Sequence, residues 1–205
     1  MEKPTVVDGG IKGWDRVDVV AKVGGSLYDL PELGSRLRAW LAELGPARVL
    51  LVPGGGATAD VIREFDRCHA LGEEVSHWLA LHALTLNAHF LTRLLSRFGP
   101  GSARVQVLDA QAFVQADEGQ PGCLAHCWEA TSDSVAARVA VVKQAAELVL
   151  LKSVTVPEQL TWEEASRYGW VDSLFPQIIR QASGLRVRAV NLRDRYQAER
   201  SSVLG

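Results

Sequence analysis

Two apolar runs that each end in a cluster of glycines constrain the fold of this chain most. The first covers about residues 16–23 and leads into the glycine turn at 24–26. The second, 47–52, is continuously apolar after Arg48 and leads into three glycines at 54–56. A continuous apolar run is typical of a strand that is covered on both faces. These segments therefore predict two buried strands of one sheet.

The segment between these strands predicts a helix. Pro31 suits the first turn of a helix, and leucines then recur at helical spacing until Gly45-Pro46. Strand, helix and strand together form a β-α-β unit, in which the two strands run parallel. Both glycine turns then lie at the carboxyl edge of the sheet, where ligands bind in open parallel sheets.

The remainder of the chain continues the same alternation. We expect one domain over 1–205, with 1–15 as an N-terminal tail. Further helices are expected at about 56–69, 73–98, 135–142, 161–168 and 172–182, and strands at 104–108, 123–128, 147–154 and 185–191. The fold class is thus α/β with a mainly parallel sheet.

Charge, hydropathy and cysteine content exclude several classes of function. The net charge of −2 provides no broad basic field, so we expect no nucleic acid partner. No apolar run is long enough for a bilayer and no signal peptide is recognisable, so we expect no membrane contact and a cytoplasmic protein. Cys68, Cys123 and Cys127, with nearby histidines, do not match a zinc-site spacing; free thiols are the favoured interpretation and no metal site is assigned.

Lys22 is the first candidate for chemistry. A lysine within an apolar strand must reach either water or an anion, because burial of an unpaired ammonium is costly. Gly24 and Gly25 let backbone N–H groups approach an anion closely, and Ser26 adds a hydroxyl donor. The stretch resembles half of a phosphate site. A lysine that extends from an edge strand into solvent is an equally good interpretation at this point.

The second glycine cluster points to the same kind of ligand. Gly54, Gly55 and Gly56 pass directly into a helix, so unpaired N–H groups meet the positive end of a helix dipole. One glycine would satisfy a tight turn, so three favour ligand contact. Neither glycine cluster matches a dinucleotide-binding or P-loop motif.

Lys152 and Asp133 add charges at predicted strand and helix ends. The chain has only five lysines against seventeen arginines, and Lys22 and Lys152 both lie near the ends of central strands. An ammonium is a compact charge that can shield a moving phosphoryl group. Asp133, within Thr131-Ser132-Asp133-Ser134, either caps a helix or faces the same sheet edge.

The helix expected at 73–98 is apolar over more of its circumference than one core contact requires. It is either deeply packed or part of a subunit interface, and we expect a homodimer or higher homo-oligomer. His77, His82 and His89 lie on this helix and could reach a substrate, although a packed, hydrogen-bonded ring is the more common role of such a histidine.

Three segments together resemble the amino acid kinase family: V-A-K-V-G-G-S, L-L-V-P-G-G-G-A-T-A-D, and T-S-D-S-V-A-A-R-V-A followed by L-V-L-L-K-S-V. They occur in the family's order over about 17–192. Other segments, among them W-E-A-T-S-D-S and Y-G-W-V-D-S-L-F-P, are most similar to members that phosphorylate a furan-methyl phosphate in methanofuran-type cofactor biosynthesis and so make a diphosphate.

The resemblance implies a three-layer αβα sandwich of the carbamate kinase-like type. It implies ATP with Mg²⁺ over a nucleotide-binding half at about 123–192 and the acceptor over a half at about 16–122. Lys22 would bridge the donor and acceptor phosphoryl groups while Asp133 orients the lysines. Phosphate or nucleotide contacts would come from Gly24, Gly25, Ser26 and Ser134, and acceptor contacts from Gly54, Gly55, Gly56, Asp60, Arg63 and His77.

The chain also departs from the family. Many members carry a second catalytic lysine further downstream, and Lys152 is the candidate for that charge here. Ala57, Thr58 and Ala59 stand where isoprenoid-phosphate kinases place a phosphate-binding histidine, so Arg63 or His77 would bind the acceptor phosphate. Asp60 or Glu129 would pair with an aminomethyl cation. The alternatives are a non-catalytic nucleotide- or anion-binding protein, and a kinase for a carboxylate or carbamate acceptor.

Overall fold

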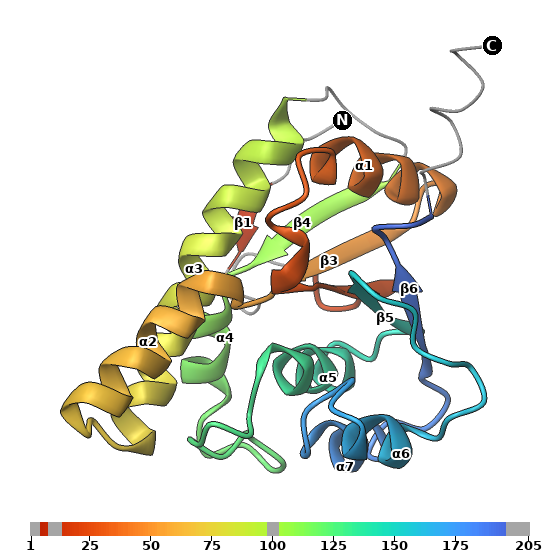
Figure 1. Ribbon diagram of the computed structural model, residues 1–205. Helices are drawn as coiled ribbons and strands as arrows, with labels where there is room; N and C mark the ends of the chain where they lie inside the picture. Colours follow the sequence, from red (N-terminus) through yellow and green to blue (C-terminus); the bar gives the residue numbers. More distant parts are fainter. Residues whose placement is uncertain (1–4, 8–13, 98–102, 196–205) are drawn as a thin grey trace.

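A six-stranded parallel sheet forms the centre of the protein, with the strand order β1-β4-β3-β2-β5-β6. The computed structural model describes residues 5–7, 14–97 and 103–195 (Figure 1). The strands are β1 (Thr5–Val7), β2 (Val19–Val23), β3 (Arg48–Pro53), β4 (Arg104–Leu108), β5 (Glu147–Lys152) and β6 (Arg186–Asn191). The expected α/β class with a mainly parallel sheet is confirmed.

The helices follow the strands in alternation. They are η1 (Gly25–Leu27), α1 (Leu33–Glu43), α2 (Gly56–His69), α3 (Glu73–Ser96), α4 (Ala110–Asp117), α5 (Ser132–Val142), α6 (Trp162–Arg167) and α7 (Phe175–Ile179). The expected capping box forms at Thr161 and Glu164, where it begins α6. None of the described helices combines the length and apolar composition that a bilayer span requires.

Alternate residues of the central strands enter two separate hydrophobic cores. On β2, Val20 joins a core with α4, α5 and α7, whereas Val19, Ala21 and Val23 join a core with α1. The long helix α3 contributes Leu81 and Leu84 to the first core and its later turns to the second. A sheet covered on both faces explains why these strands are continuously apolar.

Three sequence expectations were wrong. Thr5–Val7, expected as tail, pairs with β4 as an edge strand. Ala110–Asp117, for which no helix was expected, forms α4, capped by the Asp109 side chain. Residues 123–128, expected as a strand, form a loop that is held by side chains rather than by a sheet: His126 contacts Glu74 and Trp128 donates to Asp66. The end of the helix expected at 73–98, at Phe98, lies outside the described residues.

Candidate functional site

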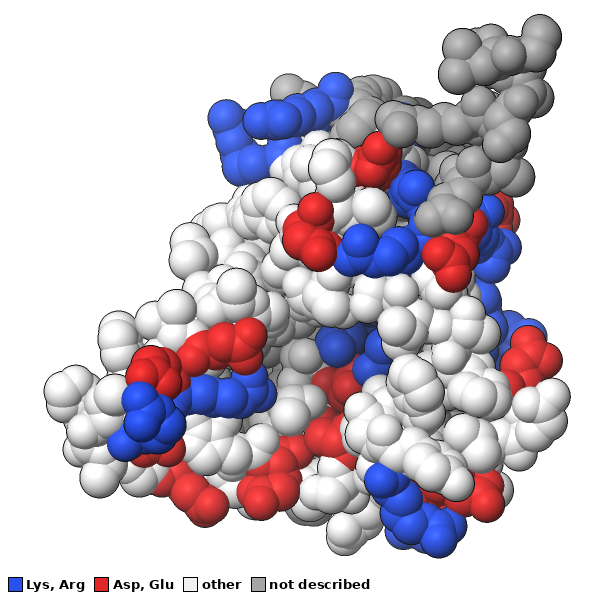
Figure 2. Space-filling view, viewed as in Figure 1, with Lys and Arg blue, Asp and Glu red and all other residues white. Residues whose placement is uncertain are grey.

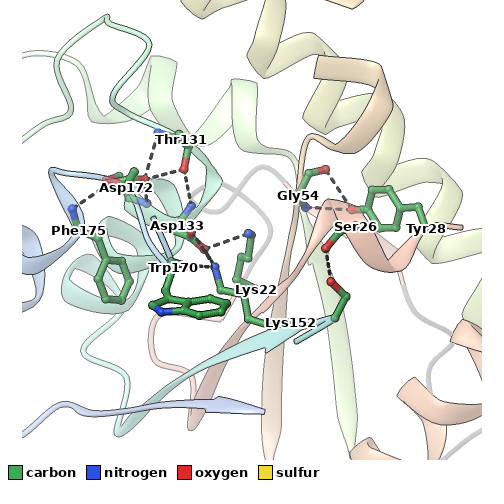
Figure 3. Close-up of polar contacts among 12 residues, drawn as sticks. Lys22, Ser26, Tyr28, Gly54, Thr131, Asp133, Lys152, Trp170, Asp172 and Phe175 are labelled. Atoms are coloured by element: carbon green, nitrogen blue, oxygen red, sulfur yellow. Dashed lines mark hydrogen bonds and ion pairs between the residues drawn. The ribbon is translucent and has the colours of Figure 1, made fainter. Parts of the chain in front are cut away.

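Lys22 and Lys152 meet at the carboxyl ends of the adjacent strands β2 and β5, and both contact Asp133. Asp133 lies in the first turn of α5. Its carboxylate is 2.9 Å from Lys22 Nζ and 3.0 Å from Lys152 Nζ (Figure 3). Lys152 Nζ also donates to the Trp170 carbonyl at 2.6 Å. Asp133 therefore holds both ammonium groups at one point of the sheet edge.

Two lysines and one aspartate leave a net positive charge in a largely buried site. The side chains of Lys22, Lys152 and Asp133 are 8%, 12% and 8% exposed. Burial would raise the pKa of Asp133, but Lys22 and Lys152 outweigh it and hold that pKa below its ordinary value. Burial and the Lys22 charge lower the pKa of Lys152 despite the attraction of Asp133. Two ammonium groups share one carboxylate, so an anion would be stabilised beside them.

Asp172 positions the start of α5, although the sequence analysis did not identify it. Thr131 is the N-cap of α5, and its hydroxyl donates to Asp172 at 2.6 Å. The backbone N–H of Ser134 donates to Asp172 at 3.0 Å and that of Phe175 at 2.9 Å; the Ser134 hydroxyl also donates to it. One carboxylate thus ties α5 to α7, which fixes the position of Asp133. Asp172 is the aspartate of Y-G-W-V-D-S-L-F-P, a segment already quoted for its family resemblance, and that segment was the available sequence signal.

The two glycine turns touch each other. A Cβ on Gly25 would lie 2.1 Å from the backbone nitrogen of Gly56, and one on Gly54 would lie 2.4 Å from that of Gly25. Gly56 also has a positive φ of 55°. Only glycine allows this approach, which brings the N-terminal end of α2, with its unpaired N–H groups, against the turn after β2.

Tyr28 and Asn87 hold the second glycine turn, at 54–56, in place. The sequence analysis assigned neither residue to the site. Burial raises the pKa of the Tyr28 hydroxyl far above its ordinary value, so the group stays neutral. It accepts from the Gly54 N–H at 2.9 Å and donates to the Gly54 carbonyl at 3.1 Å. Asn87 donates to the carbonyls of Gly54 and Gly55, both at 2.8 Å. The backbone polar groups of Gly54 are thereby occupied and do not face a ligand.

A cavity of about 280 Å³ opens beside the lysines and the glycine turns. Figure 2 shows this face of the molecule with a hollow in which charged side chains lie between uncharged surroundings. Nine of the residues expected in the site line the cavity: Lys22, Gly24, Gly25, Ser26, Gly55, Gly56, Arg63, His77 and Lys152. The Ser26 hydroxyl is 2.8 Å from that of Ser153, which joins the turn after β2 to the end of β5.

Five expected residues do not line the cavity. Asp133 lies behind the two lysines, and Gly54 is occupied by Tyr28 and Asn87. Ser134 is fully buried and bonds to Asp172, so it offers nothing to a nucleotide in this conformation. Asp60 is exposed and pairs with Arg63 at 2.6 Å. Glu129 is also exposed and absent from the cavity wall.

Comparison with known proteins finds similarity to kinases. No protein-family model matches the chain. Over 147 residues, or 66% of its length, the chain is 24% identical to [5-(aminomethyl)furan-3-yl]methyl phosphate kinase of Methanocaldococcus jannaschii, and the match spans 65% of that relative.

Solved structures show the same architecture. A uridylate kinase from Archaeoglobus fulgidus has a TM-score of 0.55 with 19% identity, covering 89% of this chain and 95% of that one. The UMP kinase of Ureaplasma parvum has a TM-score of 0.59 with 13% identity, covering 86% and 90%. The chain has the amino acid kinase fold. The resemblance to that family, first indicated by the motifs, is confirmed, and at these identities the structural likeness shows the fold alone.

Within this amino acid kinase fold, Arg63 and His77 line the cavity from α2 and α3. The Arg63 guanidinium lies 5.3 Å from the centre of the Trp128 ring, on the loop where a strand was expected. Burial and the nearby His126 ring lower the pKa of His77. Arg63 therefore adds a cation to the cavity wall, while His77 is neutral at pH 7.

The residues that line the cavity do not form a magnesium site of their own. The described lining residues include hydroxyls, amides and cations but no carboxylate, and no group of three or more His, Cys, Asp or Glu in the described ranges is arranged to hold a metal. Mg²⁺ in proteins requires oxygen ligands, commonly carboxylates and substrate phosphates. A magnesium ion at this site would have to be carried by phosphate oxygens.

Proposed function

We propose that this protein is an ATP-dependent phosphotransferase that acts on a small phosphomonoester and converts it to a diphosphate. The observation that carries the proposal is the pair of buried lysines sharing one carboxylate beside two glycine turns in contact. Such a site neutralises several phosphoryl oxygens at once. The chemistry requires positioning and charge stabilisation more than a base.

The reaction we assign is an in-line displacement. An oxygen of the acceptor phosphate forms a bond to the γ-phosphorus of ATP while the bond to the β-phosphate oxygen breaks, and ADP leaves with that electron pair. Lys22 lines the cavity on β2, between β3, which leads into the second glycine turn, and β5, which carries Lys152; in this proposal it contacts both donor and acceptor oxygens. A phosphomonoester is largely ionised at pH 7, so no proton has to be removed by the protein.

The nucleotide belongs, in this proposal, to the half at about 123–192 and the acceptor to the half at about 16–122. A second cavity, of about 700 Å³, lies between the loop at 155–160 and β6. Its wall includes Asn191, the register partner of Lys152. A nucleoside in this cavity would direct its phosphates towards Lys152, and Mg²⁺ would arrive bound to those phosphates.

The decisive experiment is ATP turnover with a panel of acceptors. We expect ADP release with at least one small phosphomonoester, and diphosphate product by ³¹P NMR. The panel contains a furan-methyl phosphate, other alkyl and aryl phosphates, UMP, carbamate and N-acetylglutamate. If only carbamate or N-acetylglutamate gave product, the acceptor class would be a carbamate or a carboxylate and not a phosphomonoester.

One observation favours a non-catalytic alternative: Lys152 Nζ is held by both Asp133 and the Trp170 carbonyl in this structure. ATP binding without product from any acceptor in the panel would support an anion- or nucleotide-binding protein with the same fold.

We also propose a homodimer through α2 and α3. Large apolar side chains of these helices are exposed: Val61 (49%), Phe65 (47%), Val75 (48%), Leu86 (60%) and Phe90 (41%). Such a patch is typical of an interaction surface. We expect twice the monomer mass by light scattering at micromolar concentration, and a monomer mass after Leu86→Glu and Phe90→Glu together. A monomeric wild type would contradict this proposal.

A further inference from the structure

His77 lines the cavity and carries an unused hydrogen-bonding atom. The side chain lies on α3, is only 3% exposed and lines the 280 Å³ cavity. Its Nε2 is buried and has no hydrogen-bond partner among the described residues. A buried polar atom left without a partner is costly, so such an atom beside a cavity points to a ligand.

The other ring nitrogen determines what Nε2 can do. The Cys127 backbone raises the pKa of His77 by hydrogen bonding to the ring. Because Nε2 has no partner among the described residues, we assign the proton that faces Cys127 to Nδ1. In a neutral imidazole with the proton on Nδ1, Nε2 is an acceptor.

The surroundings keep the ring in this neutral form. The His126 ring stacks on His77 at 4.9 Å between centroids, and the two ring nitrogens of His126 contact Glu74 and Glu118. Burial lowers the pKa of His77 most, and His126 adds to this; the Cys127 carbonyl and the two glutamates oppose it but are outweighed. The cations Lys22, Arg63 and Lys152 line the same cavity.

Resting on the proposed function, we propose that His77 is a specificity-determining residue whose Nε2 accepts a hydrogen bond from a hydroxyl or amino group on the body of the phosphomonoester. The phosphate itself is left to the lysines, Arg63 and the glycine turns. This differs from the sequence-based hypothesis in which His77 binds the phosphate, because a neutral ring with a free lone pair has no proton to donate there.

The test uses three matched probes: benzyl phosphate, 3-(hydroxymethyl)benzyl phosphate and 3-(aminomethyl)benzyl phosphate. Dissociation constants are measured by calorimetry at pH 7.5 for the wild type and for His77→Leu, His77→Gln and the exposed control His69→Leu. We expect the wild type and the control to bind a donor-bearing probe about 5- to 10-fold more tightly than benzyl phosphate. In His77→Leu this preference should disappear while benzyl phosphate still binds, and His77→Gln should retain part of it.

A preference that survives in His77→Leu, or that is absent in the wild type, overturns the inference. If His77→Leu does not fold, His77→Gln and the pH dependence of the wild-type preference decide the question. Protonation of Nε2 removes the acceptor, so the preference should persist at pH 7.5 and fall only as the pH drops below about 6.5; a ratio independent of pH would overturn it. The phosphate group titrates in all three probes alike, so its effect cancels in the ratio of the dissociation constants of benzyl phosphate and a donor-bearing probe. Failure of the proposed kinase activity is seen separately, as absence of ADP release from every acceptor.

Discussion

Replacement of Lys22 by alanine is expected to lower ATP-dependent phosphorylation by about 10³-fold or more while the protein remains folded. A cation that stabilises the transferring phosphoryl group contributes on this scale. Asp133 would keep Lys152 as its partner at 3.0 Å, so no buried charge is left alone. The measurement is ADP release with the best acceptor of the panel, together with circular dichroism.

Lys143→Ala is the matched control for Lys22→Ala. Lys143 is equally buried, at 7% exposure, but follows the last residue of α5 and does not line the cavity. We expect this variant to retain the wild-type rate. Full activity of Lys22→Ala would contradict the role assigned to Lys22, and an equal loss in both variants would show that the loss follows from burial of a lysine rather than from the site.

Replacement of Asp133 by asparagine is expected to cost about 3–5 kcal/mol of the free energy of unfolding and to remove activity. The substitution leaves two ammonium groups largely buried without a counter-charge, which is the costly way to break a buried ion pair. Urea unfolding followed by circular dichroism measures the first effect, and ADP release at a temperature where the variant is folded measures the second.

The pH dependence of stability gives a second measure of how much Asp133 contributes to the free energy of unfolding. Because its pKa is lower in the folded protein than the ordinary 3.8, its contribution to stability is complete above pH 3.8 and is lost as the pH falls through the lowered value. The Asp133→Asn variant should lack this part of the acid sensitivity.

Asp117→Asn separates the loss of stability from the loss of chemistry. Asp117 forms a similarly buried pair with Arg138, at 2.7 Å, away from the two lysines. We expect the Asp117→Asn variant to lose about as much free energy of unfolding as Asp133→Asn, but to retain activity where it is folded. An Asp133→Asn variant with wild-type activity would refute the role of Asp133 as the group that orients the lysines.

Local patterns were sufficient for most of the fold. The strands with Lys22 and Lys152 and the helix after Gly54–Gly56 follow from apolar runs, helical spacing and glycine positions, all of which act within a few residues. The missed helix α4 is only eight residues long, so its periodicity was weak, although Asp109 is a good cap. The loop at 123–128 has strand-like composition, but it pairs with none of the strands that the structure describes, and its side chains bond to α2 and α3 instead.

The sequence by itself determined the positions of β2 to β6 and of both glycine turns, and the placement of two lysines near the carboxyl ends of strands. It also carried the family resemblance. Only the tertiary structure decided that one carboxylate serves both lysines, that Asp172 holds the start of α5, and that Tyr28 and Asn87 hold the second glycine turn. It also decided that Nε2 of His77 has no hydrogen-bond partner among the described residues. The physical reason is range: periodicity and turn chemistry are local, whereas these contacts join residues far apart in the chain and depend on the register of the sheet.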